Sequence, residues 1–229
     1  MWQIFSHDYD TQASYYGVQK ACESVHIQLD LSNYEVAVVN TTRQPQPGLS
    51  LAATVFSLDN KTLFHHEERK DASPDALTDG FKLDLAPFFL SDVVLVKLEL
   101  HNSGGQVVSQ NLYWLSAETS SYRELVRLPQ ADVSAIAVSK RSGDKVYIHV
   151  QLQNRGNAAS LEEKLTLLNA DDGSRVLPVY LSDNYVSLLP GETREVEIEY
   201  STAVAKGRVQ LAVRGWNLAR ERISVAEDK

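Results

Sequence analysis

The chain has 229 residues and is acidic: 22 Lys and Arg stand against 30 Asp and Glu, for a formal net charge of −8. Such a length suits one large or two average domains, each able to bury a core. An acidic chain with no basic block lacks the charge that binding to a phosphate backbone requires. No segment approaches the roughly 20 apolar residues of a membrane span. We therefore expect no nucleic-acid partner and no membrane span.

The first predicted element is a helix at residues 14 to 25. Apolar side chains recur there every three or four residues from Tyr15 to Val25, and Ser14 is placed as the N-cap. The single cysteine, Cys22, lies in this stretch, so no intrachain disulfide is possible. We expect Cys22 to be a small buried residue rather than a nucleophile.

The remainder of the chain has the period-two alternation of β-strands. In residues 195 to 200, for example, Val196, Ile198 and Tyr200 alternate with glutamates, which predicts one buried and one exposed face. The predicted strands are 25–30, 35–42, 49–58, 62–68, 80–85, 93–100 and 107–115, then 133–139, 146–153, 161–168, 175–179, 186–188, 195–200 and 209–214. Turn signals about every 8 to 12 residues are typical of immunoglobulin-like sandwiches.

A capping box at Ser121 to Glu124, followed by Pro129, predicts a short helical turn between the two halves. The sequence thus predicts an all-β protein: two consecutive immunoglobulin-like β-sandwiches with one N-terminal helix. We place the sandwiches at residues 24–117 and 118–229.

Three stretches resemble the C-terminal immunoglobulin-like domains of glycoside hydrolase family 2, of exo-β-glucosaminidase or β-mannosidase type. They are residues 15–28 (YYGVQKACESVHIQ), residues 111–116 (NLYWLS), and a set made of residues 150–154, 177–180 and 183–192. Ser24 stands where the family usually has proline. The resemblance runs along nearly the whole chain and occurs in the family's order.

This resemblance implies that residues 1–23 are the remnant of the end of a catalytic barrel, with its helix. Barrel enzymes place binding groups at the C-terminal ends of strands. In the full-length parent, Trp2 would then stack on a sugar, and Asp8 or Tyr9 would hydrogen-bond to it. The alternative is that these residues merely cover a domain edge. The two glutamates of the retaining mechanism would lie upstream, so no catalytic residue is assigned to this chain.

Asp183, Asn184 and Tyr185 allow two interpretations. Asp and Asn side chains bond neighbouring backbone groups at strand ends, and Pro190-Gly191 fits the centre of a type II turn, so a structural role accounts for them. The alternative is that all three border a sugar-binding cleft of the parent. The exposed apolar side of the predicted helix, at Tyr15, Tyr16, Val18 and Val25, is the expected contact with the barrel.

Other clusters of polar and aromatic residues give weak support for a metal site or a carbohydrate site. His65-His66-Glu67-Glu68 would place two ligands on each face of a strand, which favours a solvated edge strand over a metal site. His7, Asp8 and Asp10 likewise have no fixed third ligand, and neither a metal nor another cofactor is predicted. Aromatic residues at four positions form a possible carbohydrate platform, although core packing is the favoured interpretation: Trp114, Tyr147, Tyr180 and Trp216.

The sequence therefore predicts a non-catalytic accessory region whose partners are the barrel of its own parent and the parent's carbohydrate substrate. Its location would be periplasmic or extracellular if that parent is a secreted bacterial glycosidase. A free-standing carbohydrate-binding or adhesion module is the alternative, and exposure of several aromatic side chains on one surface would favour it.

Overall fold

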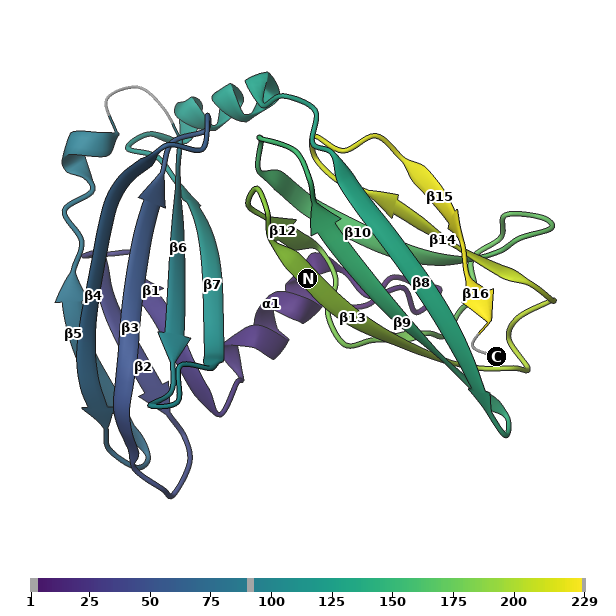
Figure 1. Ribbon diagram of the computed structural model, residues 1–229, viewed down its shortest axis with the longest axis horizontal. Coiled ribbons are helices and arrows are strands. Elements are labelled where there is room, and N and C mark those ends of the chain that lie inside the picture. Colours follow the sequence, from purple (N-terminus) through teal and green to yellow (C-terminus); the bar gives the residue numbers. More distant parts are fainter. Residues whose placement is uncertain (1–3, 90–92, 228–229) are drawn as a thin grey trace. The chain divides into compact units, whose positions relative to one another are not determined.

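The computed structural model describes residues 4–89 and 93–227, and it contains two compact units (Figure 1). One unit is Gln19–Arg127, which we call the first sandwich. The other joins Met1–Val18 to Leu128–Lys229, and we call it the second sandwich. Strands make up most of the regular structure in both, which confirms the predicted all-β fold. The predicted boundaries after residues 23 and 117 stay predictions.

The first sandwich has two antiparallel sheets, with strand orders β1-β2-β5 and β4-β3-β6-β7. Its elements are β1 (Val25–Asp30), β2 (Glu35–Asn40), β3 (Gln46–Phe56), β4 (Thr62–Ala72), β5 (Ala76–Lys82), β6 (Val94–His101), β7 (Val107–Leu115) and the 3-10 helices η1 (Ala86–Phe88) and η2 (Thr119–Arg127). The helical turn predicted before Pro129 is therefore present as η2. The edge position of β4 confirms that His65 and His66 lie on an exposed edge strand.

The second sandwich also has two sheets, with orders β12-β10-β14-β15 and β11-β13-β9-β8-β16. Its strands are β8 (Val133–Ser142), β9 (Lys145–Asn154), β10 (Ser160–Asn169), β11 (Tyr180–Leu181), β12 (Val186–Leu188), β13 (Thr193–Ser201), β14 (Val209–Arg214), β15 (Glu221–Ser224) and β16 (Ala226–Glu227). Helix α1 (Ala13–Ala21) carries the chain from this unit into the first sandwich.

Alternation along the strands builds both cores. In the first sandwich, Val96 and Leu98 of β6 share one buried cluster with Ile27 of β1, and all three are 0 % exposed. In the second, Val196 and Ile198 of β13 are likewise fully buried, as their alternation with glutamates predicted. Burying such a side chain contributes roughly 1.5–3 kcal/mol relative to leaving it in water.

The structure corrects three predictions near the N-terminus. Helix α1 ends at Ala21 rather than residue 25, because Val25 already pairs with Asn40 at the start of β1. Ser14 lies inside the first turn and is not the N-cap. Cys22 is exposed rather than buried, since the helix ends one residue before it.

Two corrections concern strands of the second sandwich. The strand predicted at 175–179 is reduced to a single bridge between Arg175 and Leu168, and β11 begins only at Tyr180. Pro178 explains the interruption, because it has no N–H to donate to a ladder. Strands β15 and β16 were not predicted; both are short and carry few apolar residues.

Glu163 is the exceptional polar residue of the second core. It is 0 % exposed and faces the sandwich interior, on the same side of β10 as Leu165. Neither carboxylate oxygen has a hydrogen-bond partner among the described residues. Burial raises the pKa of Glu163 to about 7. Glu163 is therefore protonated in the folded protein below neutral pH.

Replacing Glu163 by Gln should stabilise the protein at pH 8 but not at pH 4.5. The folded pKa of about 7 exceeds the ordinary value of 4.5, so the folded state binds the proton more tightly and stability falls as pH rises through this interval. The shift corresponds to about 3 kcal/mol at pH 8. Urea unfolding at both pH values measures the effect. Glu221→Gln, at an exposed carboxylate, is the control. An equal gain from Glu163→Gln at both pH values would contradict the assignment.

Candidate functional site

The N-terminal segment, residues 4–18, folds against the second sandwich. Its backbone closes on itself: Phe5 and Thr11 form a bridge, and the Ser6 N–H donates to the Asp10 carbonyl over 2.9 Å. Tyr9 takes a positive φ of 65° at the bend. This geometry presents the side chains of the segment to strand β10 and to the loop before β12.

An aromatic cluster anchors the segment in the core. The Tyr16 ring lies 5.1 Å from Tyr15 and 6.1 Å from Tyr185, and Phe5 lies 5.8 Å from Tyr15. Tyr16 is only 6 % exposed, and its hydroxyl lies 2.8 Å from that of Thr11. Burial raises the pKa of Tyr16, so the phenol is neutral in the folded protein. The helix side predicted to be free for a barrel is therefore largely covered: Tyr16 is buried and Tyr15 packs on the second core, whereas Val18 stays exposed.

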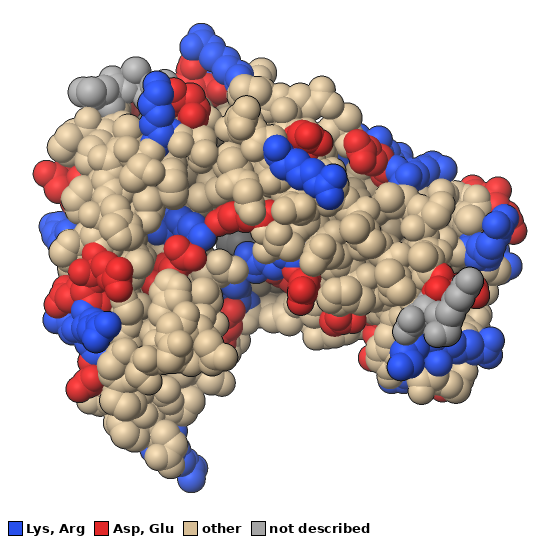
Figure 2. Space-filling view, viewed as in Figure 1, with Lys and Arg blue, Asp and Glu red and all other residues tan. Residues whose placement is uncertain are grey.

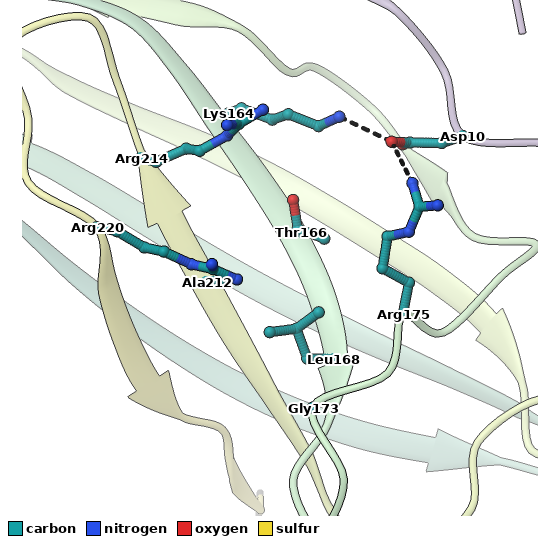
Figure 3. Close-up of a pocket in the computed structure, with 9 residues that line it drawn as sticks. All are labelled: Asp10, Lys164, Thr166, Leu168, Gly173, Arg175, Ala212, Arg214 and Arg220. Carbon is teal, nitrogen blue, oxygen red and sulfur yellow. Dashed lines mark hydrogen bonds and ion pairs between the residues drawn. The ribbon is translucent and has the colours of Figure 1, made fainter. Parts of the chain in front are cut away.

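Ion pairs also attach the same segment to the second sandwich. The Asp10 carboxylate accepts from Lys164 Nζ at 2.8 Å and from the Arg175 guanidinium at 3.0 Å (Figure 3). Arg175 also pairs with Asp8, which in turn accepts from the Ser6 hydroxyl. Arg175 is a shared partner of both aspartates, so it fixes the two ends of the bend on the sandwich.

Lys164 is the buried member of this network, with 9 % of its surface exposed. Burial by itself lowers the pKa of Lys164, but the Asp10 carboxylate and Tyr185 outweigh that effect, so its pKa lies above the ordinary value. Its ammonium stands 5.2 Å from the centre of the Tyr185 ring. Lys164 is thus a fixed positive charge at neutral pH.

Asn184 makes the backbone contacts that its residue type suggested, and the alternative that residues 183–185 border a cleft of the parent stays a prediction. Asn184 is 3 % exposed, and its amide both accepts from the Leu165 N–H at 2.7 Å and donates to the Leu165 carbonyl at 3.1 Å. The side chain therefore extends the β10 ladder where β12 has not yet begun. Asp183 pairs with Arg194 at 3.3 Å. Gly191 has φ of 83° at the turn after β12, as the predicted Pro-Gly turn requires.

The three predicted sugar-binding residues differ in what surrounds them. Trp2 lies outside the described residues. Asp8 is engaged by Arg175 and Ser6, and Tyr9 is 72 % exposed at the bend. Their role toward a sugar stays a prediction. Lys164 and Arg175 were not singled out from the sequence, because their partner Asp10 lies more than 150 residues away along the chain.

A polar cavity of about 450 Å³ opens beside the ion pairs. Nine residues line it: Asp10, Lys164, Thr166, Leu168, Gly173, Arg175, Ala212, Arg214 and Arg220 (Figure 3). Asp10 is the single acid among these nine residues, against four cations. The lining suits binding of a negatively charged group rather than acid-base catalysis.

Metal binding finds no support in the parts of the chain that the structure describes. No group of three or more His, Cys, Asp or Glu residues there is arranged to hold an ion. The His65 ring instead lies 2.9 Å from the Thr54 hydroxyl, and the His66 ring stands edge-on to Phe81 at 4.4 Å. Within the same ranges no helix is long and apolar enough to cross a membrane.

Three of the four aromatic residues expected in the core are exposed. Tyr147, Tyr180 and Trp216 are 38 %, 52 % and 55 % exposed, respectively, whereas Trp114 is half-buried. Tyr147 and Tyr180 belong to strands whose other face already fills the core, and alternation turns both outward.

Acidic and basic side chains are interspersed over the visible surface, without a large basic area (Figure 2).

Removing the Asp10 carboxylate should loosen the N-terminal segment. Asp10→Asn leaves Lys164 buried without its counter-ion, which costs on the order of 1–3 kcal/mol locally. Amide hydrogen exchange should become about 10-fold faster or more at Ser6, Gln12 and Tyr15, whose N–H groups bond within the segment. Asp132→Asn removes the same charge at an exposed site of the same unit. Equal exchange rates in the two variants would contradict the anchoring role of Asp10.

Comparison with known proteins finds a family match for each half of the chain. Residues 32–117 match the Mannosidase Ig/CBM-like domain, and residues 111–218 match the exo-β-D-glucosaminidase Ig-fold domain. The exo-β-D-glucosaminidase of Amycolatopsis orientalis is 31 % identical over 97 % of this chain and 24 % of its own length. That of Streptomyces avermitilis is 28 % identical over 98 % of this chain and 27 % of its own.

A solved structure agrees with these matches. The crystal structure of the Amycolatopsis orientalis exo-chitosanase superposes with a TM-score of 0.89 at 28 % identity, over 98 % of this chain and 29 % of that chain. The chain thus spans about a quarter of the length of the relatives it matches. The two matches together confirm the predicted resemblance of this chain to the C-terminal immunoglobulin-like domains of family 2 glycoside hydrolases of exo-β-glucosaminidase and β-mannosidase type.

Proposed function

We propose that this chain is a non-catalytic accessory region of a family 2 glycoside hydrolase of exo-β-glucosaminidase or β-mannosidase type, and that its partner is the catalytic barrel of the parent. The observation that carries this function is the anchoring of residues 4–18 in the second sandwich. The resemblance assigns that segment to the end of the barrel, and Asp10 and Tyr16 bind it to the sandwich through ion pairs and aromatic contacts. The sandwich would thereby support the barrel's last strand and loop.

Two sources of attachment make this support rigid. Tyr16 is part of the apolar core of the second sandwich, and Lys164 lies almost buried beneath Asp10. Polar and apolar anchors therefore act on the same segment, residues 4–18. In the parent, the barrel would precede this segment in the chain. Contacts within the present chain would then hold the end of that barrel against the sandwich.

The carboxylates of residues 4–18 and the buried carboxylate of Glu163 do not suit glycoside hydrolysis. A retaining enzyme needs a protonated acid and an ionised nucleophile about 5 Å apart, both open to substrate. Asp8 and Asp10 both pair with Arg175, and Asp10 also pairs with Lys164, so both carboxylates are engaged within the chain. Glu163 holds its proton to about pH 7 but is sealed in the core. Catalysis in the parent would come from its barrel.

The purified chain is accordingly expected to release no p-nitrophenol from p-nitrophenyl β-D-glucosaminide or p-nitrophenyl β-D-mannoside above the buffer rate. The exo-β-D-glucosaminidase of Amycolatopsis orientalis serves as the positive control. Hydrolysis that rises in proportion to chain concentration would overturn the non-catalytic assignment. The accessory role also requires a reading frame that continues upstream of the Met1 codon into a barrel, and a stop codon there would refute it.

The outward face of one sheet supports a second candidate function, carbohydrate binding by the chain itself. Glu199 pairs in register with Tyr180 on one side and with Tyr147 on the other, so the three side chains form a row. Both rings are exposed and can pack on the C–H faces of a sugar, and Glu199, which also pairs with Lys145, lies between them. Neighbouring His149 lies 2.6 Å from Glu197, which raises the His149 pKa.

If this face binds sugar, Tyr180→Ala and Tyr147→Ala should each weaken the binding of glucosamine or mannose oligosaccharides about 5-fold, equivalent to about 1 kcal/mol per ring. Isothermal titration calorimetry measures the affinity. Phe64→Ala is the matched control, because Phe64 is 38 % exposed but lies in the first sandwich. Saturable binding that survives both tyrosine substitutions would place the sugar elsewhere, and absence of binding by the unaltered chain would reject this candidate.

A further inference from the structure

The positive charges of the 450 Å³ cavity are only partly neutralised. Lys164 and Arg175 have Asp10 as a partner, and Arg175 also has Asp8. Neither Arg214 nor Arg220 has a carboxylate partner among residues 4–89 and 93–227. The cavity therefore contains two cations that the N-terminal segment leaves uncompensated.

The sheet register makes this imbalance unfavourable. Arg214 on β14 stands directly opposite Lys164 on β10, and both side chains lie on the outer face of the sheet. Like charges opposite each other in a ladder destabilise a sheet. Asp10 neutralises the charge of Lys164, but the charge of Arg214 has no such partner among the described residues. An anion bound next to Arg214 would remove the remaining repulsion.

The positions of the charges decide where an anion would sit. Arg214 and Arg220 lie on the side of the cavity opposite Asp10 and Arg175, with Thr166 between them (Figure 3). Asp10 would repel a second anion, so the anion belongs on the arginine side. Guanidinium groups donate paired hydrogen bonds to carboxylate and phosphate oxygens, and this geometry favours an oxyanion over a halide.

The size and the remaining lining indicate what else the ligand carries. A cavity of about 450 Å³ lies within the range of small-molecule sites, which is roughly 300–1,000 Å³, and far exceeds a single phosphate. Thr166 offers a hydroxyl, and Leu168 and Ala212 offer apolar surface, on the floor between the charged walls. Gly173, with φ of 68°, keeps one rim free of a side chain. Such a mixture suits a hydroxylated ring.

We infer that this cavity binds a sugar-sized, hydroxylated molecule bearing an oxyanion, either a carboxylate or a phosphate. Arg214 and Arg220 hold the oxyanion, and Thr166 meets the hydroxyl-bearing part. The site lies on the outer face of the β10-β14-β15 sheet, and Asp10 of the N-terminal segment lines its far side. Binding of a ligand there goes beyond the accessory function proposed above.

Isothermal titration calorimetry on the whole chain tests the site with glucose 6-phosphate, glucuronate, inorganic phosphate and glucose as probes. Glucose 6-phosphate or glucuronate should bind saturably, and the tighter of the two identifies the oxyanion. Inorganic phosphate and glucose should each bind at least about 10-fold more weakly, because each lacks half of the recognised chemistry. Equal affinity for inorganic phosphate, or for glucose, would overturn the inferred ligand class, as would absence of saturable binding by both acids.

Two single substitutions place the ligand in the cavity. Arg214→Gln and Arg220→Gln should each weaken binding by about 10-fold or more, since each removes a charge-assisted contact. Arg155→Gln is the matched control, an exposed arginine of the same unit outside the cavity. Circular dichroism checks that each variant is folded, and both arginines are exposed side chains that the core does not require. An equal loss with Arg155→Gln would show general attraction to charge and refute the site.

Discussion

The position of the N-terminal segment depends on one carboxylate. Asp10 receives hydrogen bonds from Lys164 and Arg175, two cations that come from separate parts of the second sandwich. Lys164 is buried far enough that it needs a counter-ion, because an unpaired charge out of water is strongly unfavourable. The segment and the sandwich therefore stabilise each other. The sandwich holds the bend in place, and Asp10 of the bend neutralises the charge of Lys164.

Polar side chains buried in the second core differ in whether they have hydrogen-bond partners. Asn154 is 0 % exposed, and its amide donates to the Ala158 and Leu188 carbonyls while accepting from the Gly156 N–H. Asn184 likewise completes the backbone ladder at Leu165. Both fix the connections between strands. Glu163, by contrast, is buried without partners and remains uncharged below neutral pH. The first two specify the fold, and the third makes its stability depend on pH.

The two outer faces of the second sandwich differ in charge. The outer face of the β10-β14-β15 sheet carries Lys164 and Arg214, whereas the outer face of β13 carries Glu195, Glu197 and Glu199. A negatively charged ligand and a neutral or cationic sugar would therefore be drawn to different sheets. The accessory role concerns the segment at residues 4–18. The outer face of β13 shares no residue with the cavity or with that segment. The cavity and the segment share Asp10, Lys164 and Arg175, so only Arg214 and Arg220 separate anion binding from anchoring.

The sequence by itself determined the strands and the family resemblance. Period-two alternation gave most strands within a few residues, because one face of each strand must be buried, and the residues around Asn154 and Asn184 carried the likeness to family 2 domains. It did not predict that Tyr147 and Tyr180 face outward, since an aromatic side chain suits a core and a surface equally well. The cavity between Asp10 and Arg214 could not be predicted from the sequence either, because only the folded sheet brings residues from distant parts of the chain together. Local pattern specifies elements, whereas charge pairing across 150 residues is decided by tertiary structure.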